Sequence, residues 1–329
     1  MFYTIARRIL RVRASDEWSA QVSDRSFRAH CLQPTSAPSS ATFHHTIEIT
    51  RQEPPEFARS NLKTFEIFSG QCYTDGESSY LTVDDSLIHT GPCSSQLTTI
   101  WIGSTPHARQ PLSLSKVISY AIQAALRRCG LFPLHAAGLI APDGEKGLLI
   151  IGESSSGKST LTLQLAAGGW RYLSDDSIVL SEEAEGVAAH GFRRRFAVTA
   201  RSLAACQMPR LSGALEERMP FDEDKQYLDP ATAFPGQLAV SCQPNVLLFP
   251  IITKQAHSAV EFLPRSAAMV HLATFCPWAC YDASTSREHL RVIARLTGQT
   301  KAYLLRAGRD LLEEAGRAEA LVSELFLNN

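Results

Sequence analysis

Residues 148–160 read Leu148-Leu149-Ile150-Ile151-Gly152-Glu153-Ser154-Ser155-Ser156-Gly157-Lys158-Ser159-Thr160, and this stretch decides how the 329-residue sequence is interpreted. Four apolar residues precede the spacing Gly-x-x-x-x-Gly-Lys-Ser, and apolar residues at helical intervals follow it, which predicts strand, loop and helix. In such a loop, backbone N–H groups converge on phosphate oxygens and the helix N-terminus adds partial positive charge. We expect Lys158 to reach the β- and γ-phosphates of ATP and Ser159 to ligate Mg²⁺. Residues 152–160 are therefore the predicted nucleotide-binding loop; the alternative is a Gly/Ser turn that precedes a helix by chance.

The segment Leu173-Ser174-Asp175-Asp176 begins only about 15 residues after Ser159. A short helix and a short strand fill that interval, which predicts a minimal β–α–β crossover whose second strand lies parallel and adjacent to the first. Both strands then end at the edge of the sheet where ligands bind. One carboxylate would hold Mg²⁺ and the other would accept a proton, and we expect Asp175 to be the base and Asp176 the metal ligand. The alternative is a solvated turn, which is our interpretation of Asp84-Asp85 because no phosphate loop precedes it.

The remainder of the sequence divides into two regions of different patterning. Up to about residue 110, short alternating segments separated by Pro, Ser, Gly and Asp predict an antiparallel β region: residues 46–50, 64–68, 80–83 and 98–102. From Pro111 onward, helical spacing at 114–128 is followed by strands at 136–140 and 148–151, and two helical segments occupy residues 286–297 and 311–327. We therefore expect an α/β protein with an N-terminal, mostly β domain (1–110), a candidate for substrate recognition, and a second domain (111–329).

Composition excludes several classes of protein. Lys and Arg total 32 against 33 Asp and Glu, a formal net charge of -1, which gives no general attraction for nucleic acid or anionic membrane surfaces. No apolar run approaches the roughly 20 residues that span a bilayer. The eight cysteines are scattered and contain no Cys-x-x-Cys pair, so buried thiols are expected rather than a disulfide framework. We expect a cytoplasmic protein without nucleic-acid or membrane partners, and leave open whether it forms a homo-oligomer.

Three motifs in close succession carry a family resemblance. Leu134-His135-Ala136-Ala137-Gly138-Leu139-Ile140, the loop at 152–160 and Leu173-Ser174-Asp175-Asp176 resemble the HPr kinase/phosphorylase group and its phosphoenolpyruvate carboxykinase-like relatives. The likeness covers about residues 110–180 and does not include residues 1–105. It implies a P-loop kinase core in which His135, Lys158, Ser159, Asp175 and Asp176 form the site and one carboxylate is the general base toward a protein serine. Without the resemblance, His135 is as compatible with a structural role as with a catalytic one.

Two departures from the family pattern bear on the substrate. Thr160 stands where HPr kinases commonly have Glu, and the glycine-rich C-terminal motif that engages HPr is replaced by His190-Gly-Phe-Arg-Arg-Arg-Phe196. The sequence is more similar to HPr-kinase-related proteins encoded with peptide-modifying enzymes, including lasso-peptide tailoring kinases. That resemblance implies a precursor peptide with a serine near its C-terminus as the phosphate acceptor.

Two further clusters have open roles. Arg193-Arg194-Arg195 could bind a peptide carboxylate or a nucleotide phosphate, or could be a solvated face. Lys225 could close over the nucleotide, or the segment 222–227 could be an exposed acidic turn. The leading hypothesis is an ATP- and Mg²⁺-dependent serine kinase; the alternatives are a small-molecule kinase or carboxykinase-like enzyme, and a nucleotide-binding switch or assembly factor without phosphotransfer.

Overall fold

The computed structural model describes residues 1–329 apart from 38–42, 68–69, 145, 194, 207, 220–221, 277–278, 280–281 and 328–329. The described residues form a mixed α/β protein with four sheets. The chain divides into two compact units: unit 1 comprises residues 1–132 and 277–290, and unit 2 comprises residues 133–276 and 291–329. The boundary therefore differs from the expected one at residue 110, because the helix at 111–128 belongs to unit 1.

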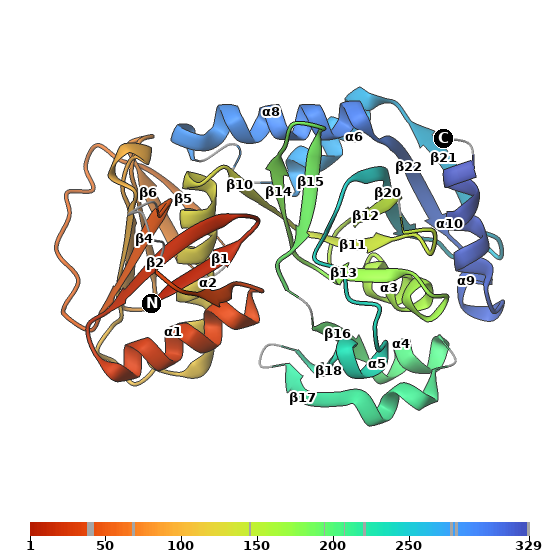
Figure 1. Cartoon of the computed structure of the whole chain (residues 1–329), viewed down its shortest axis with the longest axis horizontal. Helices are drawn as coiled ribbons and strands as arrows, with labels where there is room; N and C mark the ends of the chain where they lie inside the picture. Colours follow the sequence, from red (N-terminus) through yellow and green to blue (C-terminus); the bar gives the residue numbers. More distant parts are fainter. Residues whose placement is uncertain are drawn as a thin grey trace. The chain divides into compact units, whose positions relative to one another are not determined.

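Unit 1 is built on one nine-stranded sheet with the order β3-β1-β2-β4-β9-β8-β7-β6-β5 (Figure 1). Four strands coincide with the segments predicted from sequence, although Phe68 lies outside the described residues. We predicted an antiparallel β region, but the sheet is mixed, because β4 lies parallel to both β2 and β9. The strands are β1 (Phe2–Ile5), β2 (Arg8–Ala14), β3 (Gln33–Thr35), β4 (His45–Thr50), β5 (Lys63–Ile67), β6 (Gly70–Thr74), β7 (Ser79–Val83), β8 (Ser86–Thr90) and β9 (Leu97–Trp101).

Two helices of unit 1 pack on each other and on this sheet. The helix α2 (Pro111–Arg128) was predicted, and it begins with proline and is followed by Gly130 at a φ of +72°. The helix α1 (Glu17–Ala29) was missed. Its buried residues are Ser19, Ser23 and Phe27, so its inner face lacks the apolar periodicity that reveals a helix. This helix lies in the connection between β2 and its parallel neighbour β4, where a crossover is required.

Unit 2 contains a six-stranded sheet with the order β13-β11-β12-β20-β22-β21. The strands β12 and β13 are each antiparallel to β11, so they are parallel to each other but not adjacent. The predicted adjacency was wrong because a tight turn, with Ala141 N–H donating to the Lys146 carbonyl, folds β11 back onto β12. The strands are β11 (Ala136–Ile140), β12 (Gly147–Ile151), β13 (Arg171–Ser174), β20 (Pro244–Ile252), β21 (Ala259–Leu263) and β22 (Lys301–Ala307).

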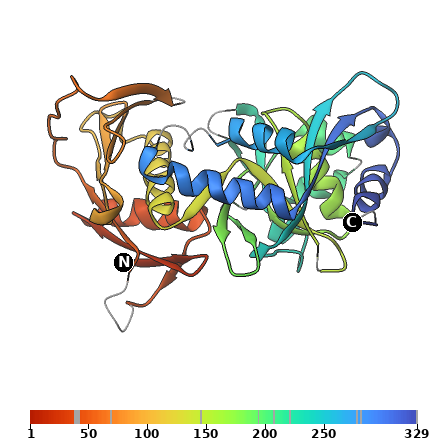
Figure 2. The same ribbon diagram turned by 90° about the horizontal axis from the view of Figure 1, so that it is seen from above.

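Helices cover both faces of this sheet (Figures 1 and 2). On one face, α3 (Lys158–Ala167) and α10 (Arg317–Leu327) enclose an apolar core that includes Val246 and Leu248 of β20. On the other face, the Phe249 ring lies 5.2 Å from that of His271 in α6 (Arg265–Thr274). The alternation of β20 side chains between the two cores fixes the strand's register, and with it the positions of the loops that follow the strands.

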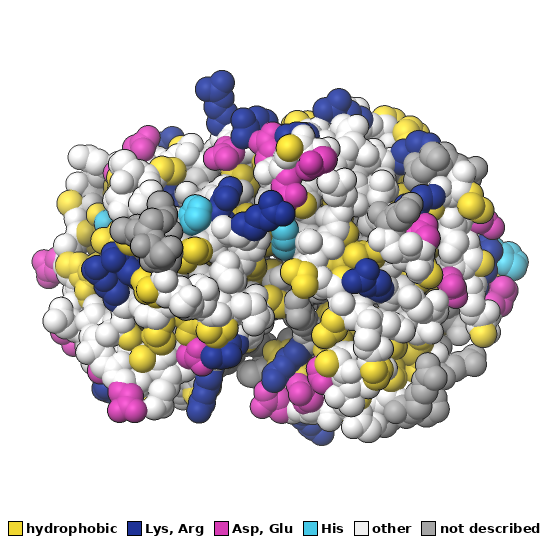
Figure 3. Space-filling model, viewed as in Figure 1, with side chains coloured by type: hydrophobic (Ala, Val, Ile, Leu, Met, Phe, Trp, Pro, Cys, Tyr) yellow, Lys and Arg dark blue, Asp and Glu magenta, His cyan; other side chains and the backbone are white. Residues whose placement is uncertain are grey.

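Two smaller sheets complete the described structure, with the orders β10-β14-β15-β19 and β16-β18-β17. Among the described residues, no helix is long and apolar enough to cross a membrane. Figure 3 shows acidic and basic side chains interspersed on the face it presents. The remaining elements are β10 (Leu131–Leu134), β14 (Ile178–Glu182), β15 (Val187–Gly191), β16 (Phe196–Thr199), α4 (Ala200–Ala205), β17 (Leu215–Met219), β18 (Asp222–Leu228), α5 (Pro230–Ala233), β19 (Ser241–Cys242), α8 (Ala283–Gln299) and α9 (Asp310–Glu313).

Candidate active site

The glycine-rich loop joins β12 to α3 and adopts a tightly curled backbone. Ser155 has a φ of +64° and Gly157 a φ of +96°, so residues with positive φ lie on both sides of Ser156, whose φ is not positive. Such alternation turns successive backbone N–H groups inward and forms an anion-binding nest. At Gly152 an added Cβ would lie 2.6 Å from the Ser156 Oγ, so any larger residue there would force the Ser156 side chain to move. The helix begins at Lys158, as predicted.

Lys158 spans this loop from the first turn of α3. Its side chain is buried, and Nζ donates hydrogen bonds to the carbonyls of Gly152 (2.7 Å) and Glu153 (2.8 Å). Burial lowers the pKa of Lys158, while the negative charges of Asp175 and Asp176 oppose that change. The ammonium group is thus held at the loop within the electrostatic field of both carboxylates.

Asp175 follows the last residue of β13 and is almost completely buried, with 1% of its surface exposed. Its Oδ2 accepts hydrogen bonds from Ser159 Oγ (3.1 Å) and from the Ala197 backbone N–H (3.2 Å). Burial, reinforced by the charge of Asp176, raises the pKa of Asp175 to about 7. The short crossover therefore brings Asp175 against the loop residue Ser159, although the two strands are not adjacent.

Asp176 is more open to solvent than Asp175. Its Oδ2 lies 3.9 Å from a guanidinium nitrogen of Arg193, and 37% of its side chain is exposed. The second carboxylate oxygens of Asp175 and Asp176 are both buried, and neither has a hydrogen-bond partner among the described residues. Two buried, unsatisfied carboxylate oxygens side by side are costly unless a ligand occupies the site.

His135 joins the same edge of the sheet from the antiparallel strand. Since β11 runs opposite to its neighbours, its first residue, Ala136, pairs with Ile151 at the end of β12. His135 therefore lies beside the ends of β12 and β13, as expected. His135 remains accessible to solvent, but partial burial by the surrounding protein lowers its pKa. The positive charge of Lys158 lowers the pKa of His135 further. Asp176 opposes this effect through its charge and its backbone.

The basic clusters divide between this site and the surface. Arg193 reaches Asp176, and Lys225 of β18 is near enough to lower the pKa of Lys158. Arg195 instead forms ion pairs with two glutamates of β17, at 3.2 Å each, and Arg194 lies outside the described residues. Tyr227 of β18 was not predicted as a site residue: burial raises its pKa, the charge of Arg193 lowers it and that of Asp176 raises it. Its position two residues after Lys225 in a strand, on the same face, was the available signal.

The residues present fit a magnesium ion bound together with a nucleotide. Mg²⁺ prefers oxygen ligands and commonly takes one or two carboxylates, water and substrate phosphates. Asp175, Asp176 and Ser159 supply that donor set, and the unsatisfied carboxylate oxygens provide ligands that no described group already uses. Among the described residues, no group of three or more His, Cys, Asp or Glu side chains could hold a metal.

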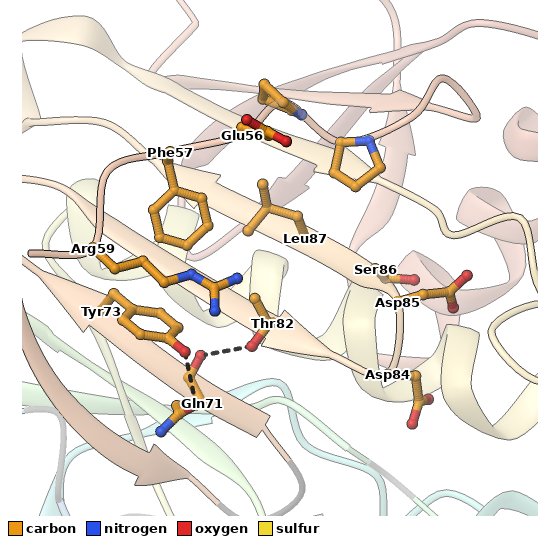
Figure 4. A pocket seen from close by; sticks show the side chains of 12 residues that line it. Glu56, Phe57, Arg59, Gln71, Tyr73, Thr82, Asp84, Asp85, Ser86 and Leu87 are labelled. Carbon is orange, nitrogen blue, oxygen red and sulfur yellow. Dashed lines mark hydrogen bonds between the residues drawn. The ribbon is translucent and has the colours of Figure 1, made fainter.

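A separate cavity of about 590 Å³ lies on the sheet of unit 1 (Figure 4). Phe57 stacks on Tyr80 with ring centroids 4.4 Å apart, and the Arg59 guanidinium lies 5.0 Å from the centre of the Tyr73 ring. Asp84 and Asp85 lie at the opposite end, in the turn between β7 and β8, as we interpreted that pair. Aromatic rings and charges of both signs suit recognition of a partner more than bond-making chemistry.

No protein-family model matches the sequence, and no curated protein matches it. Among solved structures, that of the HPr(Ser) kinase/phosphatase from Coxiella burnetii is similar to this chain at 15% sequence identity and a TM-score of 0.31. The similarity covers 60% of this chain and 94% of that protein. A similarity this distant assigns no residue of the site.

Proposed function

We propose that this chain is an ATP- and Mg²⁺-dependent kinase of the HPr kinase type, which phosphorylates a serine of a protein or ribosomal precursor peptide. The observation that carries the proposal is the hydrogen bond of 3.1 Å between Ser159 and Asp175. It joins the start of the helix after the glycine-rich loop to the buried Asp175, whose Oδ1, like that of Asp176, has no hydrogen-bond partner among the described residues. A phosphate nest, a lysine and paired carboxylates at one sheet edge are the parts that phosphoryl transfer requires.

The same hydrogen bond favours exchanging the roles that we expected from the sequence for the two aspartates. Ser159 and Asp175 lie close enough to ligate one ion, as the loop hydroxyl and a neighbouring aspartate do in other nucleotide-binding proteins. Asp175 is therefore proposed as the metal ligand. Asp176, which is more exposed and next to His135, is proposed as the general base that a substrate hydroxyl can reach.

The proposed reaction is an in-line displacement. The acceptor serine oxygen attacks the γ-phosphorus, the bond to the β–γ bridging oxygen breaks, and Asp176 takes the hydroxyl proton. Lys158 and the loop N–H groups stabilise the charge that develops on the phosphoryl and leaving oxygens. Arg193, in the segment before β16, and Lys225, in β18, add positive charge. When bound, Mg²⁺ would neutralise phosphate charge.

The cavity in unit 1 is proposed to recognise the peptide away from the reacting serine. Phe57 and Tyr73 supply aromatic area, and Arg59 and the Asp84–Asp85 pair supply opposite charges at its two ends. Aromatic residues and arginine are the side chains that most often dominate binding energy in protein interfaces.

The test is intact-mass analysis of reactions with ATP and Mg²⁺. The acceptors are candidate peptides encoded beside the gene, together with an HPr protein. A gain of one phosphate on a serine is expected with the wild type. The same gain is expected with Lys301→Ala, because Lys301 is the first residue of β22 and lies at the end of the strands opposite to the phosphate loop. Lys158→Ala should show none, because it removes the side-chain contact to the transferring phosphate. Wild-type turnover by Lys158→Ala would overturn the site assignment.

A further inference from the structure

The order of strands in unit 2 determines along which strand ends a bound nucleotide extends. The carboxylates Asp175 and Asp176 follow β13, at one end of the sheet, and the phosphate-binding loop follows β12. If the γ-phosphate faces the carboxylates and the loop holds the phosphates, the nucleoside must extend from the loop in the direction away from β13. It then lies over the ends of β20 and β22, which are the next strands after β12 and parallel to it.

A narrow cavity of about 100 Å³ lies at that place, on the α3 face of the sheet. Its walls come from four elements that meet there: the first turns of α3, the end of β20, the end of β22 and the short helix α9. Most of the lining side chains are apolar, including Ile252, Leu305, Leu311 and Leu312. Ile252 comes within 3.6 Å of the position that a Cβ on Gly157 would take, so the slot adjoins the phosphate loop directly.

The few polar groups of the slot offer little means of distinguishing one purine from another. Gln164 lines the slot and donates its amide N–H to the carbonyl of Leu311, while its amide oxygen is a hydrogen-bond acceptor. An acceptor of that kind can bond to the N6–H₂ group of adenine or to the N–H groups of guanine. Ser156 and Thr160 belong to the phosphate-binding loop itself.

Resting on the proposed function, we infer that this slot between α3, β20, β22 and α9 holds the base of the nucleotide and accepts adenine and guanine alike. The base is held by apolar contact with lining side chains such as Ile252 and Leu312, and not by hydrogen bonds specific to one base. A pocket of this chemistry contributes affinity through buried area, whereas strong selection between bases requires hydrogen-bonding groups matched to one of them.

Titration calorimetry with Mg²⁺ and three ligands tests the inference: ATP, GTP and inorganic tripolyphosphate, which lacks a base. ATP and GTP should bind within about fivefold of each other, since a site without matched hydrogen bonds discriminates weakly. Ile252→Ser and Leu312→Ser should each weaken ATP and GTP by about three- to tenfold, from the apolar area lost, and leave tripolyphosphate unchanged. These side chains are 62% and 43% exposed, so both variants should fold. Val270→Ser, 66% exposed on α6 and outside the slot, is the matched control.

The outcomes separate this inference from the proposed function. Equal losses for ATP and tripolyphosphate, or no loss for either, in Ile252→Ser and Leu312→Ser would overturn the base site but leave the phosphate site in place. A preference for one purine above about a hundredfold would overturn base tolerance. If the wild type binds neither ATP nor tripolyphosphate, or if Lys158→Ala binds both as the wild type does, the proposed function itself fails.

Discussion

Replacing the buried carboxyl at position 175 with an amide, Asp175→Asn, should make the protein more stable and inactive. Burial raises the pKa of Asp175 from 3.8 to about 7 in the folded chain. Between those pH values the unfolded chain has lost this proton while the folded chain retains it, so the group's contribution to stability falls as pH rises toward 7 and then levels off. Asparagine keeps the acceptor for Ser159 and Ala197 but carries no charge at any pH.

The magnitude follows from the two pKa values. Each unit is worth about 1.4 kcal/mol, so ionising Asp175 in the folded protein costs about 4 kcal/mol at most. The amide leaves one buried N–H group in place of the unsatisfied Oδ1, at a cost of about 1 kcal/mol that does not depend on pH. We therefore expect Asp175→Asn to match the wild type within about 1 kcal/mol at pH 4.5 and to exceed it by roughly 2–3 kcal/mol at pH 8.5.

Urea unfolding monitored by pulsed hydrogen exchange, read on peptides from β12, α3 and β13, measures this difference within unit 2. The measurements run without nucleotide from pH 4.5 to 8.5. Asp229→Asn is the control: Asp229 is the N-cap of α5, and hydrogen bonding lowers its pKa, so its effect should be constant across this window. If the difference between Asp175→Asn and wild type stays flat from pH 4.5 to 8.5, the carboxyl ionises without penalty and the reasoning about the site is wrong.

Three further predictions concern the metal, the core of unit 1 and the acceptor. Ser159→Ala should raise the Mg²⁺ concentration for half-maximal activity several-fold; an unchanged Mg²⁺ titration would argue against the hydroxyl as ligand. Asp282→Ala should destabilise unit 1 by about 3–5 kcal/mol, because it removes the carboxylate that lies 3.1 Å from Arg127 and 2.8 Å from Arg128, both of which have buried side chains. Urea unfolding read on unit 1 peptides measures the loss of stability, and a loss below about 1 kcal/mol would contradict the prediction. Phe57→Ala should raise KM for the peptide acceptor and leave KM for ATP unchanged; steady-state kinetics decides, and equal KM values for the peptide would remove this cavity from recognition.

Local patterns predicted the elements of unit 2 better than their arrangement. The strand before Gly152 and the helix from Lys158 follow from patterns within about 20 residues. The strand β13 could pair with β12 or with β11, and it pairs with β11, which therefore lies between the other two. Short apolar segments do not encode which neighbour a strand pairs with. The same limit applies to unit 1, where β4 pairs in parallel with strands that are distant in the sequence.

The site was predictable where a motif stands at a strand end, and less so where residues reach it from elsewhere. Lys158 and the aspartate pair follow directly from the spacing of two short motifs. Arg193 and Lys225 come from segments whose polar composition also suits a solvated surface, so only the structure separates Arg193, which contacts Asp176, from Arg195, which pairs with glutamates. The roles proposed for Asp175 and Asp176 likewise depend on which of them lies against Ser159.

The inserted strand explains how a crossover this short can still bring a carboxylate to the loop. The strand β13 must pass beyond β11, and it can lie close to β11 because Gly138 has no side chain: an added Cβ there would lie 3.3 Å from the Leu173 Cβ. The close approach holds Asp175 within hydrogen-bonding distance of Ser159 across the intervening strand. The same insertion brings the start of β11, and His135 before it, between the glycine-rich loop and the aspartate pair. A side chain at position 138 would press on Leu173, two residues before Asp175, so Gly138 favours the packing that the proposed site depends on.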